Sequence, residues 1–169
     1  MSLRPIAPRR RPLDGPRLRV PASKSIANRE LVLSALADGV SHLDLGPLDP
    51  GDDVRAMREA LGALGYEVRD EGDGRLRIVG GEARLPVGPA ALEAHEGGTV
   101  ARFGIALAAA GAHATVVDGS ERMRERPIAP LLRALRELGA AVEGDRLPVT
   151  VRGPLAGGTV TVPGNESSQ

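Results

Sequence analysis

The chain has 169 residues, with 22 basic and 22 acidic side chains, so its formal net charge is zero. It contains no cysteine and no tryptophan, and one residue each of tyrosine and phenylalanine. These numbers exclude disulfide scaffolds and zinc–cysteine sites, a stacking platform for single-stranded nucleic acid and a general polyanion binder. We expect a globular protein with an aliphatic core that binds no nucleic acid.

Helical and strand patterns alternate along the first half of the chain. Apolar residues at helical spacing predict two helices, each ended by a glycine, Gly39 and Gly65. Alternating runs predict strands, and the Glu71–Gly74 turn predicts a β-hairpin. In chain order we expect an extended run, a helix, a strand, a helix and a hairpin, at residues 18–20, 26–36, 42–45, 52–64 and 66–79.

The second half follows the same order of elements. A helix is expected to begin at Thr99 and to end at Gly111, and a strand follows it. The next helix is expected to begin at Pro127, because proline suits the first helical position, and to end at Gly139 before another hairpin. The four elements are expected at residues 99–110, 114–117, 127–138 and 142–151.

An internal repeat relates the two halves. The segment ALGALGYEV at 60–68 aligns with ALRELGAAV at 134–142, a shift of 74 residues, and TVTVPGNESSQ at 159–169 resembles LRVPASKS at 18–25. The predicted fold class is therefore α/β (α+β), built from repeated βαβαββ units at about 17–88, 89–156 and 157–169. Because the third copy stops before its first helix, we expect the sequence to be truncated within that unit.

Small polar residues mark the start of the first helix in each unit: Ser23 and Ser25, Thr99, and Ser167 and Ser168. Helix N-termini present unpaired N–H groups and the positive end of the helix dipole, so they bind anions. Three such N-termini facing one another would form an anion-binding crevice. A helix-capping role alone is the alternative for each of these residues.

Cationic residues accompany the same helix starts. Lys24 is the only lysine among 22 basic residues, which suggests a need for a compact ammonium group that contacts phosphate or carboxylate. Arg29 lies on the same helical face as Ser25, and Arg102 lies near the start of the second unit's first helix. The Gly97–Gly98 pair would let a ligand approach the backbone. An anion clamp and a solvated surface are both open for the cluster Arg122, Arg124 and Arg126.

No pattern predicts a metal, a cofactor or a membrane segment. The histidines His42, His95 and His113 lack metal-ligand spacing, and Gly80–Gly81 is not part of a dinucleotide-binding motif. The longest apolar stretch, Phe103–Val117, is shorter than the roughly 20 residues of a membrane-spanning helix, and the first residues show no export signal. We expect a cytoplasmic protein that uses neither metal nor organic cofactor.

Four segments resemble the motifs of one family: PASKSIANR at 21–29, GGTVARF at 97–103, RMRERPI at 122–128 and SSQ at 167–169. They are similar, in order and spacing, to those of the 5-enolpyruvylshikimate-3-phosphate (EPSP) synthases, that is, the 3-phosphoshikimate 1-carboxyvinyltransferases. The resemblance implies an enolpyruvyl transferase-like fold of two domains, each with three βαβαββ units about a pseudo-threefold axis. Residues 1–16 would then belong with a C-terminal domain that this sequence lacks, and 17–169 would form a partial N-terminal domain.

The resemblance also implies a reaction and its site. The enolpyruvyl group of phosphoenolpyruvate would be transferred to the 5-hydroxyl of shikimate 3-phosphate, with release of phosphate, in the shikimate pathway of aromatic amino acid biosynthesis. Shikimate 3-phosphate would be bound by Lys24, Ser25, Arg29, Ser167, Ser168 and Gln169. Phosphoenolpyruvate would be bound by Lys24, Gly98, Arg126 and Gln169. Lys24, which would contact both substrates, is the catalytic candidate in this chain.

The family's acid and base carboxylates lie in the C-terminal domain. We therefore expect the 169-residue chain alone to be inactive, and the full-length enzyme to be a monomer. Two alternatives stay open. One is a non-catalytic phosphate- or carboxylate-binding module of the same fold. The other is a sister UDP-N-acetylglucosamine enolpyruvyl transferase, which Ser25 and the RMRERP motif disfavour.

The sequence departs from the family pattern beside the helix that begins at Thr99. The segment His95–Glu96–Gly97 stands where Gly-Asn-Ala is frequent, and Asn165–Glu166 replaces small or apolar residues before SSQ. A carboxylate at Glu96 beside an anionic substrate would repel it, unless this side chain turns away or is paired.

Overall fold

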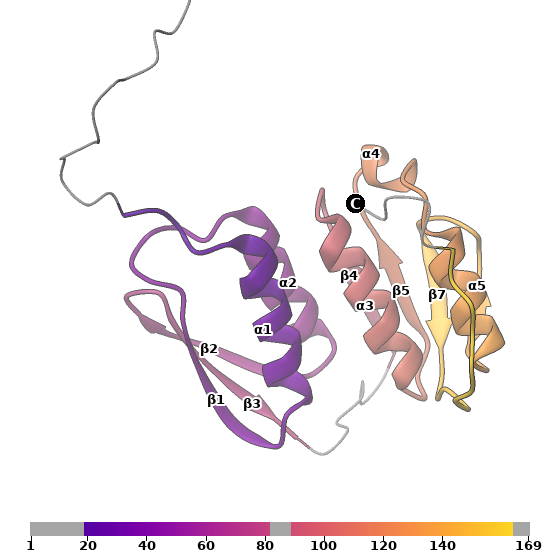
Figure 1. Ribbon diagram of the computed structural model, residues 1–169, viewed down its shortest axis with the longest axis horizontal. Coiled ribbons are helices and arrows are strands. Elements are labelled where there is room, and N and C mark those ends of the chain that lie inside the picture. Colours follow the sequence, from indigo (N-terminus) through magenta and orange to yellow (C-terminus); the bar gives the residue numbers. More distant parts are fainter. Residues whose placement is uncertain (1–18, 82–88, 164–169) are drawn as a thin grey trace, which may run out of the picture.

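The computed structural model describes residues 19–81 and 89–163 of the chain, and Figure 1 draws the remaining residues as a grey trace. The first half forms two helices beside a sheet, as the periodicity predicts. Its elements, in chain order, are α1 (Lys24–Leu36), β1 (Gly39–Asp44), α2 (Asp52–Ala63), β2 (Glu67–Gly72) and β3 (Arg75–Gly80). Figure 1 shows α1 and α2 side by side on one face of this sheet.

The second half forms a second sheet with its own helices. Its elements, in chain order, are β4 (Ala90–Glu93), α3 (Gly98–Ala110), β5 (Thr115–Asp118), α4 (Glu121–Arg124), α5 (Ala129–Glu137), β6 (Ala141–Glu143) and β7 (Val149–Arg152). The short helix α4 was not predicted. It occupies the connection in which the RMRERP motif lies.

The two sheets pair their strands in the same way, with one difference. The first sheet has the order β1-β3-β2 and the second the order β4-β5-β7-β6, and in both sheets the last three strands are antiparallel neighbours. Strand β4 adds a parallel partner to β5, and no described strand does the same for β1. The extended run expected at 18–20 is therefore wrong as a strand in its described part, since Arg19 and Val20 are irregular and exposed. They precede Pro21, which has no N–H group to donate to a neighbouring strand.

Equivalent helices of the two units are separated by a constant number of residues in the sequence. Helices α1 and α3 span residues 24–36 and 98–110, which are 74 residues apart, and α2 and α5 end at positions with the same separation. Gly65 and Gly139 follow these two ends with positive φ values of 93° and 101°, a conformation that favours glycine, so their predicted role as helix terminators is confirmed. The same separation relates the segments that precede α1 and α3.

Two helix boundaries differ from the expectation. Helix α1 ends at Leu36 with Ala37 as its C-cap, and Gly39 instead begins β1. Helix α5 begins at Ala129 rather than at Pro127, with Pro130 in its first turn. Residues 125–128 form the connection between α4 and α5, so the helix starts two residues later than the proline pattern indicates.

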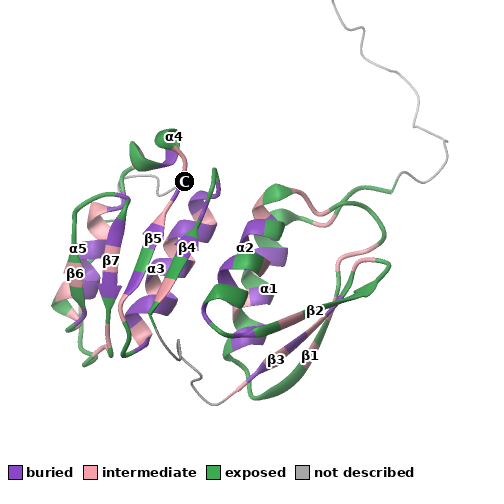
Figure 2. Ribbon diagram, turned by 180° about the vertical axis from the view of Figure 1, so that it is seen from behind, coloured by how far each residue is buried: buried purple, intermediate pink, exposed green. Residues whose placement is uncertain are grey.

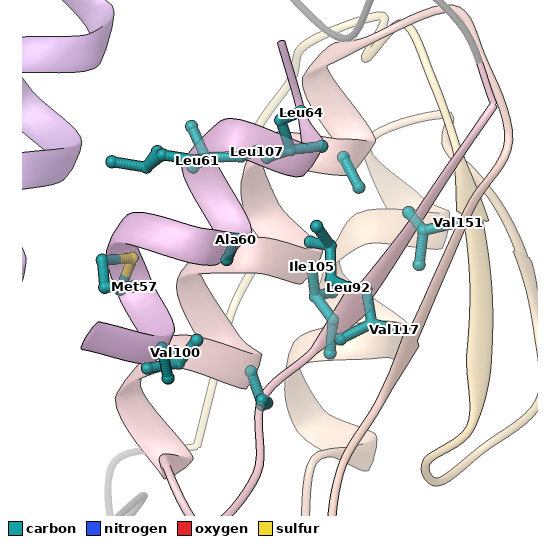
Figure 3. Packing of buried hydrophobic residues seen from close by; sticks show 14 of the residues in the cluster. Met57, Ala60, Leu61, Leu64, Leu92, Val100, Ile105, Leu107, Val117 and Val151 are labelled. Atoms are coloured by element: carbon teal, nitrogen blue, oxygen red, sulfur yellow. The ribbon is translucent and has the colours of Figure 1, made fainter. Parts of the chain in front are cut away.

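One continuous apolar core joins the two units. Residues of α2 pack against α3 and β4, and the cluster continues through α3 to β5 and β7 (Figure 3). Figure 2 shows buried residues on the helix faces that point toward these neighbours and exposed residues on the opposite faces. Residues 157–163 form no helix or strand, and 164–169 lie outside the described residues. The third unit, the truncation and the pseudo-threefold axis therefore stay predictions.

Candidate functional site

A cationic cleft lies where the N-terminal ends of α1 and α3 approach the segment around α4, at one end of the molecule (Figure 1). Its volume is about 820 Å³. The cleft is lined by five cationic residues, two carboxylates and four other residues: Lys24, Arg29, Arg102, Arg122, Arg126, Asp53, Glu96, Ser25, Gly98, Thr99 and Phe103. Residues that lie far apart in the sequence thus meet on one surface with an excess of positive charge.

The start of α1 supplies Lys24, Ser25 and Arg29. Lys24 and Ser25 are the first two residues of the helix, and both are exposed. The Arg29 guanidinium donates from Nη1 to the Ser25 carbonyl oxygen at 2.7 Å, which holds it against the first turn. The three α1 residues predicted for the site therefore lie together on the cleft wall, as their spacing indicates.

Helix capping does not account for the small polar residues at these helix starts. Ser23 is the N-cap of α1 but accepts no hydrogen bond with its side chain, and Gly97, the N-cap of α3, has no side chain to offer. Ser25 and Thr99 lie inside their helices. The capping alternative is therefore wrong for the described residues, and the first two residues of each helix line the cleft without a side-chain cap from the N-cap position.

Gly98 lies beneath two guanidinium groups at the start of α3. Arg102 donates to the Gly98 carbonyl at 3.0 Å and to the Pro127 carbonyl at 3.2 Å, so it ties the RMRERP segment to the helix. A Cβ atom at Gly98 would lie 2.8 Å from Nη1 of Arg126 and 2.9 Å from Nη1 of Arg102. A side chain at position 98 would therefore push the ends of both arginine side chains away from the helix start.

The two guanidinium groups, Arg102 and Arg126, repel each other, and a bound anion would reduce this repulsion. Burial lowers the pKa of the Arg102 guanidinium, and the positive charge of Arg126 nearby lowers this pKa further. Arginine nevertheless stays protonated at neutral pH. Two guanidinium groups that repel each other beside uncapped N–H groups form a site that favours a phosphate or carboxylate.

The arginines of the RMRERP motif divide into two sets. Arg122 and Arg126 line the cleft, whereas Arg124 binds Asp118 at the end of β5, with Nε–Oδ1 at 2.9 Å and Nη2–Oδ2 at 2.7 Å. Hydrogen bonding from Arg124 lowers the pKa of the Asp118 carboxyl, with a further contribution from the backbone N–H of Gly119. Arg124 therefore has a structural role, which the sequence pattern did not distinguish from the roles of its neighbours.

The two carboxylates of the cleft have different surroundings. Asp53, in the first turn of α2, forms an ion pair with Lys24, in which Oδ2 and Nζ are 2.9 Å apart. Glu96 lines the cleft and is exposed, and the ion pairs found among residues 19–81 and 89–163 do not include it. The turn formed by Ala94–Gly97 places Glu96 at the cleft rim, and its effect on an anionic substrate stays a prediction. Asp53 was not among the residues predicted for the site, and its position in the first turn of a helix is typical of an aspartate that stabilises the helix dipole.

Some of the predicted site residues lie outside the described part of the chain. Ser167, Ser168 and Gln169, with Asn165 and Glu166 before them, fall in 164–169, which the structure does not describe. Within the described residues, histidine and acidic side chains do not gather in groups of three or more that could hold a metal ion. The described helices also include none with the length and hydrophobicity needed to cross a bilayer.

Comparison with known proteins identifies a family. Residues 9–169 match the family model of EPSP synthase (3-phosphoshikimate 1-carboxyvinyltransferase). The chain is 47% identical over 150 residues to 3-phosphoshikimate 1-carboxyvinyltransferase of Rhizobium etli, which covers 88% of this chain and 35% of the relative. It is 41% identical over 161 residues to the enzyme of that name from Thermococcus kodakarensis, covering 94% of this chain and 38% of the relative.

The structure matches a solved structure of the same family. The EPSP synthase from Acinetobacter baumannii superposes with a TM-score of 0.70 at 26% sequence identity, over 80% of this chain and 32% of that chain. The mixed helix and sheet architecture is thus that of EPSP synthases. The chain spans about a third of the length of the relatives that it matches.

Proposed function

The chain belongs to the EPSP synthase family, and from this membership we propose that it takes part in the transfer of the enolpyruvyl group from phosphoenolpyruvate to the 5-hydroxyl of shikimate 3-phosphate. In this reaction the hydroxyl loses its proton to a base and its oxygen bonds to C2 of phosphoenolpyruvate, while C3 takes up a proton from an acid. Phosphate then leaves C2 and a proton leaves C3, which restores the double bond. The chain would bind both anionic substrates and orient them.

The observation that carries the proposal is the convergence of five cationic side chains from three segments on one cleft of about 820 Å³. Each substrate bears a phosphate and a carboxylate, so a site for both must neutralise several negative charges at short range. Two carboxylates line the same cleft, and one of them is paired with Lys24. The cleft therefore keeps an excess of positive charge that matches such ligands.

The two ends of the cleft suit different ligands. Lys24, Ser25 and Arg29 line the α1 end, and we assign shikimate 3-phosphate to it. Gly98 and Arg126 line the α3 end, and we assign phosphoenolpyruvate to it. An ammonium group has three N–H donors, of which Asp53 takes one. Lys24 thus keeps donors for both ligands. Ser167, Ser168 and Gln169 stay proposed shikimate 3-phosphate ligands, with Gln169 near phosphoenolpyruvate as well.

Turnover needs groups beyond this cleft. General acid–base catalysis requires a titratable group within hydrogen-bond reach of each transferred proton. Among the residues that line the cleft, Asp53 is engaged by Lys24, and Glu96 lies at the rim. We infer that the acid and base are carried by a second, C-terminal domain, and that the 169-residue chain binds substrates without turning them over.

Ligand titration tests the assignment. Calorimetry with shikimate 3-phosphate should show binding to the chain, and affinities lower by about tenfold or more for Lys24→Ala and Arg29→Ala, because each removes a charge-assisted contact. Arg124→Ala is the control, since it removes an arginine of the RMRERP motif that binds Asp118 and does not line the cleft. Equal affinity in all variants, or no binding by a folded chain, would contradict the assignment.

The non-catalytic binding module is the second candidate, and the sparse supply of free carboxylates in the cleft favours it. The candidates separate in a complementation assay, in which a separately expressed C-terminal domain of a family member is added with both substrates. Release of phosphate that depends on Lys24 supports the synthase. Binding of shikimate 3-phosphate without phosphate release, when the added domain is active with its own N-terminal half, supports the module.

A further inference from the structure

Two adjacent aspartates begin α2, and they have different partners. Asp53 binds the Lys24 ammonium on α1, with Oδ2 and Nζ 2.9 Å apart, and its side chain is 25% exposed. Asp52 is 94% exposed and binds Arg55 on its own helix. Both carboxylates lie in the first turn of α2, where they interact equally with the helix dipole. The Asp53 contact, by contrast, links two helices at the wall of the cationic cleft.

We propose that Asp53 is a positioning residue for anion binding, because it holds the Lys24 ammonium at the cleft wall before a ligand arrives. The proposal rests on the proposed function of the cleft. A lysine side chain loses considerable rotamer freedom when it is ordered, and the Lys24 side chain is 65% exposed, so little apolar packing restrains it. The contact to Asp53 orders it in advance, and the ligand then meets donors already in place.

Stability and binding respond differently to this pair. An ion pair between side chains this exposed adds little to the free energy of folding. The Asp53→Ala and Asp52→Ala variants should therefore have similar free energies of unfolding, since each substitution removes one charge from the same helix turn. Ligand affinity should separate the two, because Asp53 is the member of the pair that contacts Lys24.

The sign of the effect distinguishes positioning from simple repulsion. A carboxylate in a cleft for anions repels the ligand, so if charge alone mattered, Asp53→Ala and Asp53→Asn would both bind anions more tightly than the wild type. Positioning gives the opposite result for Asp53→Ala, which loses the hydrogen-bond acceptor. Asp53→Asn keeps an acceptor oxygen for the ammonium, so its affinity should stay close to that of the wild type.

The titration uses the whole chain with shikimate 3-phosphate and, separately, inorganic phosphate as probes. We expect Asp53→Ala to weaken binding about tenfold, Asp53→Asn to stay within about threefold, and the control Asp52→Ala to stay within about twofold. In a Lys24→Met background, Asp53→Ala should have no further effect. Tighter binding by Asp53→Ala, equal losses at positions 52 and 53, or additive losses with Lys24→Met would each overturn the proposal.

A spectroscopic measurement tests the same contact without a ligand. Because Lys24 is the only lysine, lysine labelled with ¹³C at Cε and ¹⁵N at Nζ gives a single side-chain signal. Its relaxation should show a restricted side chain in the wild type and in Asp52→Ala, and a mobile one in Asp53→Ala. Equal mobility in wild type and Asp53→Ala would overturn the proposal, whatever the chain binds. Restricted mobility without binding of either probe would contradict the proposed function instead.

Discussion

Helices α1 and α3 are the same length and occupy equivalent positions in the two units, yet their apolar residues have different surroundings. Val100 and Leu107 of α3 are 1% and 6% exposed, whereas the equivalent residues of α1, Ile26 and Leu33, are 61% and 59% exposed. Helix α3 packs against α1, α2 and α5 as well as its own sheet. Helix α1 has described neighbours on fewer sides, so one of its faces stays uncovered.

The first residues of the two helices differ in a way that matters for the site. Position one of α1 is Lys24, whose side chain enters the cleft, and position one of α3 is Gly98, whose backbone is bare. The space that a side chain at Gly98 would need is occupied by Arg102 and Arg126. The start of α1 thus supplies a cation of its own, whereas the start of α3 leaves room for two arginines from elsewhere in the cleft.

The largest expected loss of stability comes from two glycines, one in each unit, whose backbone lies against the backbone at the end of a helix. A Cβ at Gly80 would lie 2.0 Å from the Ala37 carbonyl oxygen, and one at Gly153 would lie 1.9 Å from the Ala109 carbonyl oxygen. Backbone atoms cannot yield as side chains do, so Gly80→Ala and Gly153→Ala should each lower the free energy of unfolding by more than about 3 kcal/mol. Urea denaturation followed by circular dichroism measures this.

The control is Gly62→Ala on α2, where a Cβ would meet no atom within 4 Å. This substitution should stabilise the helix by about 0.5–1 kcal/mol. A large loss at Gly80 with no loss at Gly153, or the reverse, would show that the close approach is a property of one unit and not of both.

A second substitution pair measures the difference in coverage of α1 and α3. Leu107→Ala removes a buried side chain and should cost about 2–3 kcal/mol of unfolding free energy. Leu33→Ala, at the equivalent position, removes a side chain that is 59% exposed and should cost less than about 1 kcal/mol. The two variants are compared in the same urea titration. Equal costs would mean that the outer face of α1 is covered in solution.

Much of the fold was predictable, because it depends on local signals. Apolar spacing located the helices, and Gly65 and Gly139 ended two of them because their positive φ values favour glycine. The start of α5 was predicted at Pro127 and was wrong, because no local pattern marks the turn of α4 that precedes it. The irregular conformation of Arg19 and Val20 was not predictable either, because a short alternating run does not tell whether a neighbouring strand is there to pair with it.

The site was predictable for its residues and less so for their interactions. The spacing of Ser25 and Arg29 placed both on one helix face, and the solitary Lys24 indicated a charged site. The contact between Lys24 and Asp53 depends on how α1 packs against α2, which no local pattern encodes. The different roles of Arg124 and Arg126 depend in the same way on which of them reaches Asp118.

A third substitution makes the segment before α3 more like the segment before α1. Glu96 stands where the first unit has Ala22, at the shift of 74 residues that relates α1 and α3. Glu96→Ala removes an exposed carboxylate from the cleft rim and should tighten binding of phosphoenolpyruvate threefold to tenfold, which corresponds to about 1 kcal/mol. Calorimetry at low ionic strength gives the largest difference, because salt screens exposed charges.

Glu30→Ala is the control for this measurement. Glu30 is an exposed carboxylate next to Arg29 that does not line the cleft, so its removal changes the net charge equally and should alter affinity by less than about twofold. A decrease in affinity for Glu96→Ala would mean that the carboxylate orders a cleft residue instead of opposing the ligand.

The smallest expected effect concerns the aspartates that end the equivalent strands β1 and β5. Asp118 binds Arg124 and the Gly119 N–H, and these contacts lower its pKa from the ordinary value of 3.8. A carboxyl whose pKa is lower in the folded state stabilises the fold above its unfolded pKa, and that stabilisation is lost as pH falls through the folded pKa. Asp118→Asn should therefore cost less than about 1 kcal/mol at pH 7, with the difference from wild type shrinking below about pH 4.

Asp44 supplies the contrast because its side chain accepts a hydrogen bond from the Gly46 N–H, and the ion pairs of the described residues do not include it. Thermal unfolding of wild type, Asp118→Asn and Asp44→Asn between pH 3 and pH 7 makes the comparison. A loss in Asp118→Asn that does not shrink on acidification would mean that the Arg124 contact acts through geometry rather than charge.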